Sequence, residues 1–163
     1  MIDAIFSPRN ACAFVTLAGA AILGSALAFQ HLGGLAPCEL CYWQRYPFWV
    51  AIPAGALAFA LPAWRPYLLA LAGVALAIGA GVAVFHVGVE QHWWQGTAAC
   101  GSPRPPAGSI EELRARLLAA PVVRCDEPQW TLLGVTMAGY NVLLSGGLAA
   151  LALAGAARAW KER

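Results

Sequence analysis

Long apolar runs separated by short polar connections dominate the chain. Four runs carry at most one charged residue each, over residues 11–32, 42–61, 66–89 and 131–157. A helix needs about 20 apolar residues to cross the hydrocarbon core of a bilayer, so each run predicts a transmembrane helix. We therefore expect an all-α membrane protein, a four transmembrane helix bundle forming a single membrane domain over residues 1–163. Two loops on one side, residues 33–41 and 90–130, complete the predicted layout.

Composition supports this class. Hydrophobic residues make up 60% of the chain and charged residues 11%, whereas a soluble domain carries about a quarter charged residues. The net charge of +2 is too small to indicate a nucleic-acid partner.

The positive-inside rule sets the orientation. Lys and Arg residues flank the runs on one side, at Arg9, Arg65, Arg158, Lys161 and Arg163. That side is predicted to be the cytoplasm, with both termini inside and both longer loops in the periplasm of a bacterial inner membrane. A cleaved signal peptide ending near Ala28 is the alternative. The first run continues to Leu32, beyond a signal core of about 7–15 residues, which favours an uncleaved helix.

Four of the five cysteines fall in the predicted outer loops. Cys38 and Cys41 form a Cys-x-x-Cys before the second run, and Cys100 and Cys125 lie in the long loop. An oxidising compartment makes disulfides expected there. Cys12 lies alone in the first run, where a cysteine usually behaves as a small hydrophobic residue, and we assign it no role.

Three interpretations of the outer cysteines compete. Structural disulfides suit Cys100 and Cys125, because closing a long loop contributes about 3 kcal/mol in the chain-entropy model. A zinc site, usually built from two closely spaced pairs, fits the second pair's spacing poorly, and we predict no metal. Redox chemistry suits Cys38 and Cys41, because a Cys-x-x-Cys pair can cycle between dithiol and disulfide.

Arg45 lies one helical turn after Cys41, at the edge of a predicted span. It can extend to the interface, as long cationic side chains do, or lower the pKa of Cys41 and bind an oxygen of an acceptor in the membrane. A strongly oxidising dithiol protein has a reduction potential of about −120 mV. Reoxidising it requires an electron acceptor with a higher reduction potential. The chain has neither a Rossmann glycine pattern for a flavin nor a haem attachment motif. A membrane quinone, ubiquinone or menaquinone, is therefore the expected cofactor.

The motifs resemble the DsbB family of disulfide-bond formation proteins along essentially the whole chain. The resemblance rests on Phe29-Gln30-His31, Pro37-Cys38-x-x-Cys41, Arg45, the segment 124–130, Leu133-Gly134 and Met137. It implies a thiol–disulfide oxidoreductase that reoxidises a periplasmic DsbA-like thiol oxidase and passes the electrons to a membrane quinone. A branch of the family called DsbI, with narrower partners, fits the same motifs.

The resemblance also implies roles for individual residues. Cys100 would be attacked by the reduced partner, and Cys125 would exchange with Cys38. Cys41 would face the quinone. Cofactor binding would fall to Arg45 and to a histidine, His86, near the outer end of the third span. Gln44 departs from the family's best-known member, which has an acid there.

Two rivals differ in class. One is a quinone enzyme resembling the vitamin K epoxide reductase family, whose cysteine pairs are arranged differently along the chain. The other is a non-enzymatic membrane protein whose cysteines only staple loops.

The long loop predicts a short amphipathic helix. Ser109 and Glu112 have the spacing of a capping box, apolar residues follow at helical intervals to Leu118, and Pro121 ends the run. The helix would lie on the outer membrane surface or pack on the bundle, and would keep Cys125 within reach of Cys38.

Overall fold

A computed structural model describes residues 7–97, 100, 108–111, 114 and 123–162. Four long helices make up most of this part: α2 (Pro8–His31), α3 (Glu39–Ala60), α4 (Arg65–Glu90) and α6 (Met137–Lys161). A short 3₁₀ helix, η1 (Pro62–Trp64), joins α3 to α4, and a hairpin of β1 (Thr131–Leu132) and β2 (Val135–Thr136) precedes α6.

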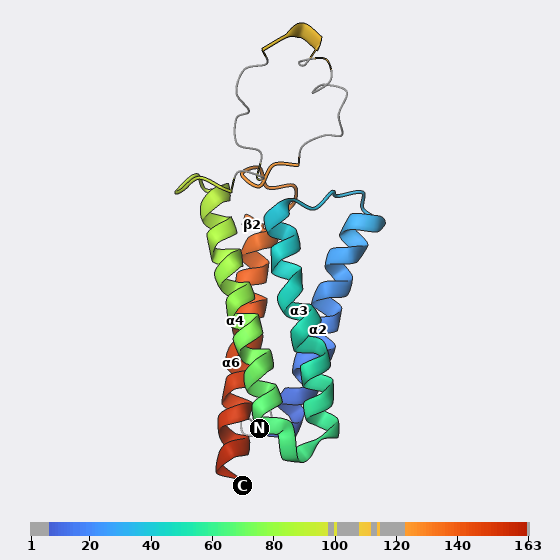
Figure 1. The fold of residues 1–163 in the computed structure, drawn as a ribbon, viewed down its shortest axis with the longest axis vertical. Helices are drawn as coiled ribbons and strands as arrows, with labels where there is room; N and C mark the ends of the chain where they lie inside the picture. Colours follow the sequence, from blue (N-terminus) through green and yellow to red (C-terminus); the bar gives the residue numbers. More distant parts are fainter. Residues whose placement is uncertain (1–6, 98–99, 101–107, 112–113, 115–122, 163) are drawn as a thin grey trace.

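The helices run alternately up and down, so both described ends of the chain lie at one end of the bundle (Figure 1). Helix α4 packs against both α3 and α6, and α2 packs against α3 and α6. Small side chains allow this close packing. A Cβ atom at Gly155 of α6 would lie 2.7 Å from the Cβ atom of Ala11 in α2.

Side-chain caps fix where three of the helices begin. Ser7 accepts a hydrogen bond from the backbone N–H of Asn10 at the start of α2. Cys38 and Thr136 do the same for α3 and α6. A cap satisfies backbone donors that have no partner inside the helix. Hydropathy predicts that α2 and α3 begin at residues 11 and 42. With their caps, α2 begins earlier, at Pro8, and α3 begins earlier, at Glu39.

Within the described residues, three helical segments are long and apolar enough to cross a membrane: Pro8–His31, Pro62–Glu90 and Met137–Lys161. The chain is therefore a multi-pass, all-helical membrane protein. Helix α3 is not among the three segments, so the expected count of four spans is not confirmed on this measure. The predicted amphipathic helix falls largely outside the described residues and stays a prediction.

The start of the fourth predicted span is wrong, because residues 131–136 form the β1–β2 hairpin and α6 begins at Met137. Thr131 pairs with Thr136 and Leu132 with Val135. The two turn residues, Leu133 and Gly134, have φ of 51° and 78°. Positive φ at both central positions is typical of the turn that joins tightly twisted strands.

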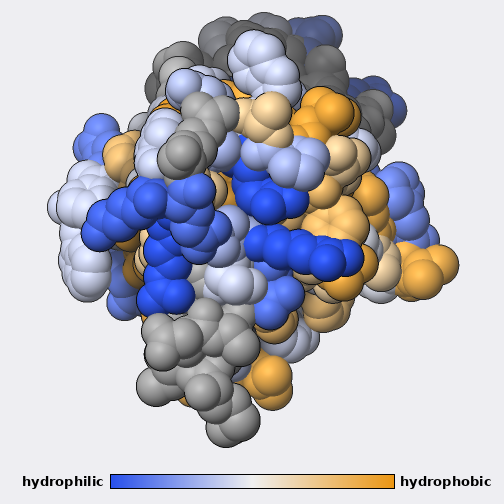
Figure 2. Space-filling view, turned by 90° about the horizontal axis from the view of Figure 1, so that it is seen from below, coloured by the Kyte–Doolittle hydropathy of each residue, from blue (hydrophilic) through white to orange (hydrophobic). Residues whose placement is uncertain are grey.

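The end of the bundle that holds both termini carries a cluster of strongly hydrophilic side chains (Figure 2). Arg9 near the start of α2, Arg65 at the start of α4 and Lys161 at the end of α6 belong to this end. The described parts of the two outer connections, which join α2 to α3 and α4 to α6, lie at the opposite end (Figure 1).

Candidate functional site

The four cysteines expected to be redox-active gather at the end of the bundle away from the termini. Cys38, Cys100 and Cys125 are buried in one apolar cluster with Leu40 and Val89, and Cys41 packs against it. Cys100 and Cys125 form a disulfide across 25 residues. The side chains of this pair are only 4% and 1% exposed, so reagents in solution have little access to either sulfur.

Cys38 and Cys41 are not bonded to each other, but their sulfur atoms lie 2.8 Å apart. The sulfur of Cys38 also accepts a hydrogen bond from the backbone N–H of Cys41, at 3.2 Å. This sulfur therefore caps α3, and the helix N-terminus places positive dipole charge beside it. The pair is arranged to form and break a disulfide with little movement.

Thr97, in the long loop, contacts the first turn of α3. The hydroxyl of Thr97 donates to a carboxylate oxygen of Glu39, in the first turn of α3. The same hydroxyl lies 3.3 Å from the sulfur of Cys100. The Cys100–Cys125 pair is thereby held beside the N-terminus of α3, which Cys38 caps.

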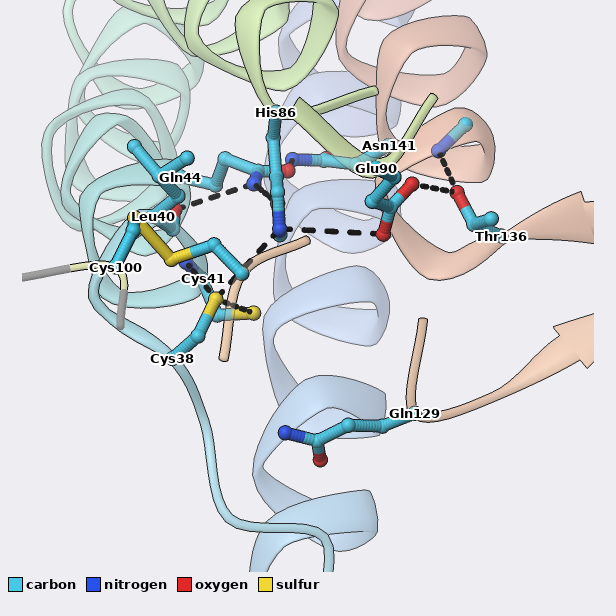
Figure 3. A network of polar contacts seen from close by, with 12 residues as sticks. Cys38, Leu40, Cys41, Gln44, His86, Glu90, Cys100, Gln129, Thr136 and Asn141 are labelled. Atoms are coloured by element: carbon cyan, nitrogen blue, oxygen red, sulfur yellow. Dashed lines mark hydrogen bonds and ion pairs between the residues drawn. A yellow bond between two sulfur atoms is a disulfide. The ribbon is translucent and has the colours of Figure 1, made fainter. Parts of the chain in front are cut away.

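His86, buried near the end of α4, faces the Cys-x-x-Cys (Figure 3). Its Nε2 lies 3.6 Å from the sulfur of Cys38 and 3.9 Å from a carboxylate oxygen of Glu90. Its Nδ1 lies 2.7 Å from the side-chain nitrogen of Gln44. Thr136 donates to the other carboxylate oxygen of Glu90, at 2.6 Å. The histidine thus connects the dithiol to polar side chains from α3 and α4.

The sulfurs of Cys38 and Cys41 and a ring nitrogen of His86 lie close enough together to share a metal ion. A histidine binds a metal only through a nitrogen that carries no hydrogen. Since Gln44 donates to Nδ1, the hydrogen of a neutral ring is on Nε2, the nitrogen that faces the sulfurs. This arrangement argues against metal binding in the present conformation.

Arg45 is half-buried on α3 and reaches across to α2. Its guanidinium donates to the side-chain oxygen of Gln30 and, at 3.4 Å, to the backbone oxygen of Ala26. It also lies 5.3 Å from the ring centroid of Tyr42, a cation–π distance. Two helices therefore hold a cation one turn from Cys41.

A cavity of about 300 Å³ opens beside Cys41 and Arg45, and Cys38, His86 and Glu90 also line it. Much of the remaining wall is apolar or aromatic, including Ile22, Phe29, Trp130, Met137 and Leu144. Small-molecule sites are mostly apolar with a few placed polar groups, and this volume lies at the lower end of their usual range. A flat apolar ring with polar edges suits such a site.

Sequence reasoning missed several polar residues around the cavity. Asn141 of α6 donates to Gln44 at 2.7 Å and accepts from Ser145 at 2.7 Å. Glu90 falls in the predicted outer loop of residues 90–130, yet it is buried at the end of α4. A polar side chain within an apolar run is costly in a membrane. That cost was the available signal for Asn141 and Ser145.

The outer segment after Val123 carries its own ion pair and a bond to the first loop. Arg124 contacts both carboxylate oxygens of Asp126, at 2.9 and 2.6 Å. The guanidinium lowers the pKa of Asp126 below its usual value. Gln129 donates to the backbone oxygen of Ala36 at 2.7 Å. The two outer loops are thus joined next to the cysteines.

Comparison with known proteins gives a consistent family. The family described as "Disulfide bond formation protein DsbB" matches residues 8–155. Disulfide bond formation protein B from Dechloromonas aromatica is 35% identical over 144 residues, covering 81% of this chain and 82% of its own. The proteins of the same name from Verminephrobacter eiseniae and Polaromonas sp. are 33% and 32% identical. They cover 93% and 96% of this chain, and 88% and 95% of their own.

No solved structure matches the chain. The family match nevertheless covers α2, α3 and α4, most of α6 and both cysteine pairs. The chain therefore belongs to the DsbB family and is a membrane protein of disulfide bond formation.

Proposed function

We propose that the chain is a quinone-dependent protein-disulfide oxidoreductase of the bacterial inner membrane. It reoxidises a periplasmic, DsbA-like dithiol oxidase and passes the electrons to the membrane quinone pool. The observation that carries this proposal is the cavity that joins Cys41 and Arg45 to an apolar wall, directly beside the second cysteine pair.

The same proposal includes a topology with four spans. Helix α3 has 22 residues and packs alongside α2 and α4, two helices that can cross a membrane. A neighbour of that length lying between two spans crosses with them. The hydrophilic end with Arg9, Arg65 and Lys161 then faces the cytoplasm, by the positive-inside rule. Both termini are cytoplasmic and all four cysteines of the two pairs are periplasmic.

Electrons enter through the long loop. A thiolate of the reduced partner attacks the sulfur of Cys100, which breaks the Cys100–Cys125 disulfide and releases Cys125 as a thiolate. Cys125 attacks Cys38 in a Cys38–Cys41 disulfide, which releases Cys41 as a thiolate facing the cavity. The burial of Cys38, Cys100 and Cys125 in one cluster supports the second exchange, because that exchange requires a thiolate with access to a sulfur.

The partner is then released and the Cys100–Cys125 disulfide of the loop reforms. The partner's second thiolate attacks its mixed disulfide and releases Cys100. Cys100 attacks Cys125 and displaces Cys38, so that Cys100–Cys125 forms again. A quinone supplies the two-electron acceptor that, with two protons, lets Cys38–Cys41 reform. The net result is that the partner's dithiol becomes a disulfide and quinone becomes quinol.

Residues of this chain fit such an acceptor. The guanidinium of Arg45 has five N–H donors, and its contacts with Gln30 and Ala26 leave others for a carbonyl oxygen. Phe29 and Trp130 pack with ring centroids 5.4 Å apart on the cavity wall, where a flat ring can lie against them. Arg45 would therefore orient the ring and Cys41 would approach its face.

The test is quinol formation by the purified protein in nanodiscs, given quinone and a reduced DsbA-like partner. We expect rapid quinol formation by the wild type, and none above background with Cys41→Ser. Cys100→Ser should lose the reaction with the partner but keep quinone reduction driven by a small dithiol. Normal quinol formation by Cys41→Ser contradicts the proposal, and no quinol from the wild type favours a merely stapled membrane protein.

A further inference from the structure

A continuous line of hydrogen bonds leads from α6 to the sulfur of Cys38 (Figure 3). Ser145 donates to Asn141, Asn141 donates to Gln44, and Gln44 contacts His86, which faces Cys38. Gln44 and His86 are 6% and 5% exposed, so water does not compete for these bonds.

The backbone fixes the direction of this line. The side-chain nitrogen of Gln44 donates to the carbonyl oxygen of Leu40 at 3.1 Å, and a backbone carbonyl can only accept. Turning the amide over would place two oxygens together at Leu40 and two nitrogens together at Asn141. The nitrogen of Gln44 therefore faces His86.

An amide nitrogen can only donate, so Nδ1 of His86 must be the acceptor and carry no hydrogen. A neutral ring then carries its hydrogen on Nε2, which lies 3.6 Å from the sulfur of Cys38. Two other acceptors lie near the ring: a carboxylate oxygen of Glu90, which is 3.9 Å from Nε2 and also accepts from Thr136, and the backbone carbonyl of Cys125.

We propose that Gln44 is a positioning residue that holds His86 in the Nε2–H tautomer, so that His86 donates a hydrogen bond to the sulfur of Cys38. Cys38 then receives two donors, the backbone N–H of Cys41 and the ring N–H of His86. Hydrogen bonds from fixed donors favour the thiolate over the thiol.

The consequence for turnover rests on the proposed function. When Cys100 attacks Cys125, the Cys125–Cys38 bond breaks, the Cys100–Cys125 bond forms and the electron pair moves to the sulfur of Cys38. The Nε2–H of His86 stabilises that leaving thiolate without giving up its proton. Cys38 therefore leaves readily, and the Cys38–Cys41 disulfide can reform when the acceptor of the proposed function takes up the two electrons.

Nitrogen-15 NMR of histidine-labelled full-length protein in nanodiscs tests the tautomer directly. The chain has three histidines, and His86→Asn identifies the signals of His86. With Cys38 and Cys41 reduced, we expect the shift of an unprotonated nitrogen at Nδ1 and of a protonated nitrogen at Nε2. A protonated Nδ1 in the neutral wild-type ring overturns the proposal without any variant.

Gln44→Glu reverses the polarity at one position. Its carboxylate accepts from Nδ1, so we expect the Nδ1 signal to become that of a protonated nitrogen. Ser145→Ala is the matched control, because the hydrogen bond of Ser145 goes to Asn141 and the Leu40 carbonyl still orients the amide of Gln44. A wild-type Nδ1 signal in Gln44→Glu, or the same change in Ser145→Ala, contradicts the proposal.

A chemical readout follows from the same change. In full-length protein whose other cysteines are replaced by serine, a small alkylating reagent measures the thiolate of Cys38 as a function of pH. In Gln44→Glu, Nε2 of His86 is free to take the thiol proton, giving an imidazolium–thiolate pair. We expect about tenfold faster alkylation below the wild-type midpoint, a difference of about one pH unit in the profile. Superimposable profiles contradict the proposal.

These two readouts need neither quinone nor partner. If the tautomer is as proposed but no quinol forms in the coupled assay, the proposed function fails and the positioning role of Gln44 stands. If quinol forms but Nδ1 carries the hydrogen, the positioning role of Gln44 fails and the proposed function stands.

Discussion

Replacing Arg45 with methionine tests how the cavity holds its ligand. The guanidinium is the cation on the cavity wall one turn from Cys41, and methionine keeps much of its length without any donor. A hydrogen bond to a charged group contributes about 1.5–3 kcal/mol. At about 1.4 kcal/mol for each factor of ten, Arg45→Met should raise the KM for quinone about 10- to 150-fold.

The effect should fall on binding. Arg45 would contact the ring before and after electron transfer, so loss of its hydrogen bond removes uniform binding and leaves kcat within about threefold. The assay is quinol formation over a range of quinone concentrations in nanodiscs, with the reduced partner in excess. Arg45→Lys is the matched control. Lysine keeps the charge but lacks the planar donor arrangement that can serve Gln30, Ala26 and a ligand at the same time. The KM for quinone of Arg45→Lys should therefore lie between those of the wild type and Arg45→Met.

A KM for quinone that stays within about twofold of wild type in Arg45→Met would refute this reasoning. The cation would then serve only the contacts between α3 and α2. In that case the variant should lose thermal stability, which circular dichroism of the same preparation measures.

Three further changes test packing, the lone cysteine and the outer ion pair. Gly155→Ala places a methyl group within 2.7 Å of a neighbouring helix and should cost about 1–3 kcal/mol of unfolding free energy in detergent, whereas Gly146→Ala in the same helix meets open space and should cost nothing; equal losses would contradict the packing argument. Cys12→Ala should leave quinol formation unchanged, because Cys12 is buried in the bundle core, does not line the cavity and donates to the backbone oxygen of Pro8; a loss of turnover would assign it a role. Arg124→Gln should raise the pKa of Asp126 toward its usual value in a carbon-13 NMR titration; since the folded-state pKa is depressed, the pair's contribution is present above the ordinary carboxyl pKa and is lost as pH falls through the depressed one, and an unchanged titration would contradict it.

Hydropathy alone predicts a helix well where charged residues bound its apolar run. Helix α4 covers Arg65–Glu90, close to the expected 66–89, because charged residues bound the run. The start of α6 could not be found this way. The strands Thr131–Leu132 and Val135–Thr136 are uncharged, like the helical run that follows them, so hydropathy does not separate them from it. The turn sequence Leu-Gly is also a weaker hairpin signal than Asn-Gly. The hairpin exists because both turn residues adopt positive φ, which a hydropathy profile does not record.

The cysteines and Arg45 were visible in the sequence because their residue types and spacing carry chemistry. Their surroundings were not. Gln44 and His86 are 42 residues apart, and Gln44 and Asn141 are 97 apart. Only helix packing brings these side chains together, and a single sequence gives no information on which faces of two helices meet. The amide at position 44 looked like a departure from a family pattern, whereas it lies at the centre of the polar network.

The burial of the Cys100–Cys125 disulfide limits which thiols can reach and reduce it. Under the proposed function, small thiols in solution would pass few electrons to the quinone through this pair, because both of its sulfurs are buried. Under the proposed function, a partner would have to expose Cys100 before its thiolate could attack. Selectivity of this pair for a partner protein would then come from the free energy that opening the buried cluster costs.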